Sequence, residues 1–83
     1  MRMPGVPWEF IEAECLRRCR ARLGCSHLEA VKIERIKPVG RGPNWQIAAF
    51  KPELSQVALA EAMREIAKLR SRFTLAPTAR RHI

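Results

Sequence analysis

Three cysteines and one histidine lie close together in the first third of the chain, as Cys15, Cys19, Cys25 and His27. Thiolates four residues apart share one face of a helix, so this spacing could hold a metal ion. Structural zinc sites, however, usually place two cysteines on a turn and a second ligand pair well downstream. Cys15 and Cys19 also fall on an apolar stripe, where small buried thiols are common. We therefore expect them to pack in the core, and we predict no metal and no cofactor.

A nucleophilic cysteine is the second chemistry that these residues could perform. Cys25 and His27 are close in sequence, but a catalytic thiolate also needs a lowered pKa and a third group that orients the histidine. Because the chain contains no aspartate, that group would have to be a glutamate, a glutamine or Asn44. The glutamates are not arranged as a carboxylate pair in two different environments, which acid–base catalysis requires. The sequence therefore predicts a protein that is not an enzyme and has no catalytic residue.

The positive charge of the chain points to a different chemistry. A net charge of +8 in 83 residues attracts polyanions such as DNA or RNA. The candidate polyanion-binding residues are Arg17, Arg18, Arg20, Arg41, Arg80 and Arg81. An arginine-rich coding bias, or a solvated helical face with internal ion pairs, would produce the same residues. The charge is also spread along the chain, without a helix-turn-helix, zinc-finger or aromatic strand motif.

The first element that positions these residues is a helix. Apolar residues at intervals of three and four predict a helix over residues 8–23, with Pro7 at its first turn and Gly24 at its end. Its glutamates precede its arginines, which complements the helix dipole, and Glu14 can reach Arg17 and Arg18. Residues 1–6 are expected to be irregular.

A β-hairpin is predicted next. Apolar and polar residues alternate over residues 31–34 and again over 45–49, with Trp45, Ile47 and Ala49 on one face. The loop between them, residues 38–43, is rich in glycine and proline. It contains Gly40-Arg41-Gly42, but phosphate loops join a strand to a helix. A plain turn is therefore preferred, and contact with a phosphate backbone is the alternative.

A second amphipathic helix is predicted from residue 54 or 55 to residue 73. Its apolar arc carries Ala58, Leu59, Ala62, Ile66, Leu69 and Phe73, and its polar arc carries Glu61, Arg64, Glu65, Lys68 and Arg72. Pro77 prevents much continuation, so residues 77–83 are expected to form a basic tail.

These elements predict a single α+β domain over residues 1–83, ordered from about 7 to 76, with a helix–hairpin–helix order. Both helices cover one face of the two-stranded sheet. The expected core residues are Trp8, Ile11, Cys15, Cys19, Leu23, Val31, Ile33, Trp45, Ile47, Leu59, Ile66, Leu69 and Phe73.

The uncovered face of the hairpin suggests a partner. A lone hairpin is marginally stable and has two open edges. Strict alternation places Phe50 and Ala48 on the outer face together with Lys32. We therefore expect Phe50, Ala48 and Lys32 to face a partner, which is either a second copy of the chain or another protein.

The expected location is the cytoplasm. The longest apolar run, residues 47–50, is too short to span a bilayer, and no apolar stretch of a signal peptide follows the first residues. Three cysteines are too few for a disulfide-stapled secreted fold.

The segment Gly42-Pro43-Asn44-Trp45-Gln46-Ile47-Ala48, followed by Phe50-Lys51-Pro52 and the alanine-rich and glutamate-rich helix, resembles a group of short uncharacterised proteins of rhizobium-like bacteria. The resemblance covers roughly residues 30–75. It implies a cytoplasmic location and no known activity.

The leading functional prediction is a non-enzymatic interaction module, an adaptor or regulator, that self-associates or binds a protein partner. The alternative is a nucleic-acid-binding protein that uses the arginines of the first helix, the Gly40–Gly42 loop and the tail. No interaction with a membrane is expected.

Overall fold

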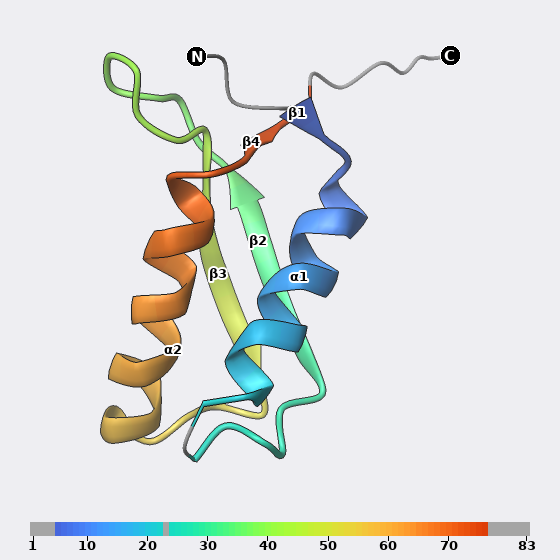
Figure 1. The fold of residues 1–83 in the computed structure, drawn as a ribbon, viewed down its shortest axis with the longest axis vertical. Helices are drawn as coiled ribbons and strands as arrows, with labels where there is room; N and C mark the ends of the chain where they lie inside the picture. Colours follow the sequence, from blue (N-terminus) through green and yellow to red (C-terminus); the bar gives the residue numbers. More distant parts are fainter. Residues whose placement is uncertain (1–4, 23, 77–83) are drawn as a thin grey trace.

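The computed structural model describes residues 5–22 and 24–76. Its elements are β1 (Gly5–Val6), α1 (Trp8–Arg20), β2 (Ala30–Arg35), β3 (Trp45–Lys51), α2 (Gln56–Arg70) and β4 (Thr74–Leu75). Figure 1 shows both helices on one side of the β2–β3 hairpin, with α1 along β2 and α2 along β3. The predicted α+β fold with a helix–hairpin–helix layout is confirmed. Leu23 and the predicted tail, with Arg80 and Arg81, lie outside the described residues.

The two helices begin differently, and only α2 has a side-chain cap. Pro7 precedes α1 in an extended conformation, and the Ser55 side chain at the start of α2 accepts a hydrogen bond from the Ala58 amide at 3.2 Å. The first helix ends earlier than predicted, at Arg20. The amides of Ala21 and Arg22 donate to the carbonyls three residues before them, as in a 3₁₀ turn, instead of four residues before. Across residues 5–22 and 24–76, neither helix is long and apolar enough to cross a bilayer.

The hairpin contains a β-bulge, which a strict alternation of apolar and polar residues does not predict. Strands β2 and β3 are antiparallel, with Ile33 opposite Ile47 but Lys32 opposite Ala49, so Ala48 is the extra residue. Side chains beyond the bulge therefore change face. Phe50 lies opposite Val31 and packs against the core. The prediction that Phe50 lies on the outer face is wrong, whereas Ala48 and Lys32 are exposed.

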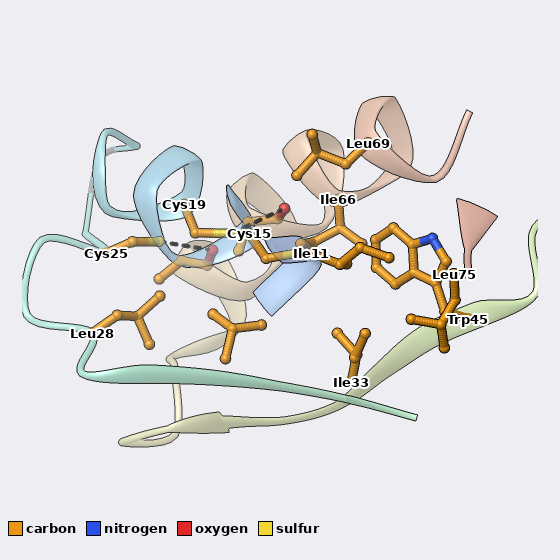
Figure 2. Close-up of a cluster of buried hydrophobic side chains, with 13 residues drawn as sticks. Ile11, Cys15, Cys19, Cys25, Leu28, Ile33, Trp45, Ile66, Leu69 and Leu75 are labelled. Atoms are coloured by element: carbon orange, nitrogen blue, oxygen red, sulfur yellow. Dashed lines mark hydrogen bonds between the residues drawn. The ribbon is translucent and has the colours of Figure 1, made fainter. Parts of the chain in front are cut away.

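The core lies between the helices and the inner face of the hairpin (Figure 2). Eight predicted residues are buried there, namely Ile11, Cys15, Cys19, Val31, Ile33, Trp45, Ile66 and Leu69. The prediction for Leu59 is wrong, because this side chain is 39% exposed. Cys25, Leu28 and Leu75 are buried but were not predicted.

A second, two-stranded sheet joins the two ends of the described chain. β1 and β4 pair in parallel, with Gly5 opposite Thr74 and Val6 opposite Leu75. Residues 5 and 6 were expected to be irregular, so this strand is a correction. The Asn44 side chain binds β4 through both backbone groups of Leu75, at 2.9 Å to the carbonyl and 2.8 Å to the amide. The hairpin and the chain ends are therefore fixed to each other.

Candidate functional site

The cysteine cluster is part of the core. Cys15, Cys19 and Cys25 form no disulfide, and all three are buried. The Cys19 thiol donates to the Ala62 carbonyl at 3.8 Å, and the Cys25 thiol donates to the Ala58 carbonyl at 3.4 Å, both on α2 (Figure 2). Burial raises the pKa of Cys15 to about 12 and that of Cys19 to about 11. The predicted core packing of Cys15 and Cys19 is confirmed.

Cys25 and His27, the residues considered for nucleophilic chemistry and metal binding, lie in different environments. His27 is exposed, whereas Cys25 is buried, and burial raises the pKa of the Cys25 thiol. A reactive thiolate needs the opposite shift. Within residues 5–22 and 24–76, no three histidine, cysteine or acidic side chains gather in a way that could hold a metal ion.

Two predicted polyanion-binding arginines on α1 are held by a carboxylate. Glu14 pairs with Arg17 at 2.7 Å and with Arg18 at 3.5 Å. The hydrogen bond from Arg17 lowers the pKa of Glu14, which keeps the carboxylate charged. Arg20 is exposed on the same helix. The Glu14 charge therefore offsets part of the positive potential of this face, which weakens its attraction for phosphates.

An ion-pair network joins the two helices. Arg22 binds Glu61, and its guanidinium also reaches Glu65 at 3.2 Å. Lys68 lies 3.2 Å from the same Glu65 carboxylate. Glu65 was predicted to face solvent, but it is 7% exposed, and its two cations compensate its buried charge. The role of this network is structural, since Arg22 connects the end of α1 to the middle of α2.

The two edges of the hairpin differ, although both were predicted to be open. At the β2 edge, the Glu12 carboxylate of α1 accepts from the Ile33 amide at 3.0 Å and from the Trp8 indole at 3.0 Å. At the β3 edge, the Arg70 guanidinium donates to the Trp45 carbonyl at 2.9 Å. Helix α1 therefore covers the middle of β2, whereas Arg70 covers only the beginning of β3.

A shallow groove, lined by apolar side chains and by Glu53, runs along the uncovered part of β3. It has a volume of about 320 Å³ and is lined by Ala48, Ala49, Phe50, Glu53, Leu54 and Leu59. Leu59 and Met63, one turn later on α2, are 39% and 41% exposed. The groove itself was not predicted, although two of its lining residues, Ala48 and Phe50, were predicted to face a partner. Leu59, at the margin of the apolar arc of α2, is the signal in the sequence that could have completed it.

The hairpin loop forms the turn that the sequence predicts. The Gly42 amide donates to the Val39 carbonyl at 3.0 Å, and Gly40 adopts a positive φ of 60°. Arg41, between the two glycines, is exposed. The loop connects two strands, so it does not lead into a helix start of the kind that phosphate loops use.

No protein-family model, curated protein or solved structure matches the chain. The resemblance to short proteins of rhizobium-like bacteria therefore stays a prediction. The function of the chain has to be argued from its own surfaces.

Proposed function

We propose that the chain is a small, non-enzymatic interaction module that self-associates through the β3 edge and the adjoining flank of α2. We define the α2 flank as Leu59, Met63 and Ala67, which follow one another at intervals of four residues and are all exposed. The observation that carries the proposal is the groove between Leu59 of this flank and the C-terminal half of β3, next to the exposed Met63. Exposed apolar surface next to an unpaired strand edge is typical of an interface.

A second copy is the occupant that this arrangement favours. If two β3 strands pair in an antiparallel manner, each α2 lies on the same side of the extended sheet, because both helices cover one face of each hairpin. The two α2 flanks would then pack against each other. Glu12 already binds the β2 edge, so association through β3 would pair the edge of the hairpin that is still open. Such an interface is isologous, and it closes as a dimer instead of growing into a fibre.

The helix flank contributes more to this interface than the strand edge. Arg70 already binds the Trp45 carbonyl, and the bulge at Ala48 interrupts the regular edge. Strand pairing is therefore expected only over the C-terminal half of β3. Because each copy carries a net charge of +8, repulsion opposes the dimer, and added salt should strengthen it.

Analytical ultracentrifugation of the full chain tests the proposal. We expect the wild-type chain to sediment as a dimer and the Leu59→Glu variant as a monomer. The matched control is Val57→Glu, which introduces the same charge on α2 at a residue that is 74% exposed and outside the flank. This control should remain dimeric. A wild-type monomer at high protein concentration, or a dimer unaffected by Leu59→Glu, would overturn the proposal.

We also infer a cytoplasmic location for this module. The inference is supported by the three free thiols, which persist in reducing compartments.

A further inference from the structure

The end of the molecule that carries the hairpin loop gathers segments that are far apart in the sequence. Arg70 binds the Trp45 carbonyl at 2.9 Å, and the Trp45 indole donates to the Phe73 carbonyl at 3.1 Å. Asn44 holds Leu75 through two hydrogen bonds. Figure 1 shows the loop beside the end of α2 and β4. The loop and residues 70–76 therefore form one continuous surface.

This surface carries cations without acidic residues among them. We define the loop-end cluster as Lys37, Arg41, Arg70 and Arg72. Residues 35–45 and 66–76 contain no glutamate or aspartate. The nearest acid on the hairpin is Glu34, which accepts a hydrogen bond from Gln46. The cluster therefore concentrates positive charge that glutamates do not offset locally.

Several cations elsewhere on or next to the helices are paired with carboxylates. Arg17 is paired with Glu14, Arg22 with Glu61, and Lys68 with Glu65. Lys37 and Arg41 belong to one loop of the sequence, whereas Arg70 and Arg72 join them only through the fold.

The shape of this end suits a large polyanion. Val39 at the tip of the loop is 90% exposed, and a Cβ atom on Gly40 would have no neighbour within 4 Å, so the loop projects into solvent. Of the two aromatic rings in residues 35–45 and 70–76, Trp45 is buried and Phe73 is half-buried against Phe10, which limits stacking on unpaired bases. Beyond Ala76, the sequence continues with residues 77–83, which include Arg80 and Arg81.

We propose that the loop-end cluster binds the phosphodiester backbone of a nucleic-acid duplex without reading its sequence. Lysine and arginine side chains contact phosphates by charge-assisted hydrogen bonds, and these contacts supply most of non-specific affinity. The site differs from the β3 groove and does not depend on self-association.

The test is fluorescence anisotropy of the full chain with a labelled DNA duplex at several salt concentrations. Four phosphate contacts give a slope of log K against log salt of about −3.6. The Lys37→Ala/Arg41→Ala variant should bind about tenfold more weakly at low salt and show a slope shallower by about 1.8. The control is Arg17→Ala/Arg20→Ala, which removes the same charge from α1 and should leave the slope unchanged.

Three outcomes would overturn the proposal. The first is no binding at low salt, and the second is an equal loss of affinity and slope in the control variant. The third is tighter binding to a single strand of the same length than to the duplex. An RNA duplex should bind comparably to the DNA duplex, because the proposed contacts are made only to the backbone. Circular dichroism of both variants should match the wild type, since all four replaced side chains are exposed.

Discussion

Replacing Asn44 by alanine tests how the hairpin is fixed to the end of the chain. The Asn44 amide group binds both the carbonyl and the amide of Leu75, at 2.9 and 2.8 Å. A hydrogen bond of this kind contributes about 0.5–1.5 kcal/mol net. Because both bonds are only partly buried, water can replace part of the interaction, and we expect a loss of about 1–2 kcal/mol for the pair.

Urea unfolding followed by circular dichroism measures this loss. In a domain of this size, each kcal/mol also lowers the Tm by roughly 4–8 °C. Hydrogen exchange measures the effect at a single amide. The Leu75 amide donates to Asn44, so it should lose protection in the variant. The control is Gln46→Ala, which removes one exposed hydrogen bond to Glu34 and should cost less than about 0.5 kcal/mol. A loss for Asn44→Ala no larger than that of the control would refute the reasoning.

Two further predictions follow from titratable groups. Burial raises the pKa of Cys15, Cys19 and Cys25, so the native protein should react slowly with a thiol reagent at pH 8, and all three thiols should react in urea; fast labelling of the native protein would contradict this. The hydrogen bond from Arg22 lowers the pKa of Glu61, so their pairing stabilises the fold above the unfolded pKa and is lost as the pH falls through the folded value. The urea midpoints of wild type and Glu61→Gln should therefore differ at pH 7, and the difference should shrink as the pH falls below the ordinary range of a glutamate. A difference that does not change with pH would argue against the pair.

The elements with strong periodicity could be predicted from the sequence. The stripe through Ile11, Cys15 and Cys19 matches one helical face, and Ser55 is a favoured helix cap. The pairing of Glu14 with Arg17 also follows from spacing within one helix. In each case the signal is local, so a single stretch of chain contains it.

Other features depend on contacts that no local pattern records. The bulge at Ala48 falls in Ala48-Ala49-Phe50, where small residues fit either face, so alternation could not reveal the change of face. Strands of two residues, such as β1, are too short to have a period. Glu65 appeared to be a surface residue, because its compensating partner Arg22 comes from the turn after the other helix.

Prediction of the candidate sites from the sequence had the same limit. Arg41 could be selected by its residue type and its glycine neighbours, but Arg70 and Arg72 join it only through the fold. The β3 groove likewise depends on how α2 lies along a strand edge, which the spacing of Leu59 and Met63 does not specify.

The parallel pairing of β1 with β4 has a practical consequence for any fusion to this domain. Since Gly5 lies opposite Thr74, a tag, dye or neighbouring domain joined at either end of the described chain would emerge at the same pole of the molecule. Figure 1 shows that this pole also holds the hairpin loop. A surface-immobilised or tagged sample would obstruct the loop-end cluster first, and it would leave the opposite pole, where α1 leads toward Cys25, accessible.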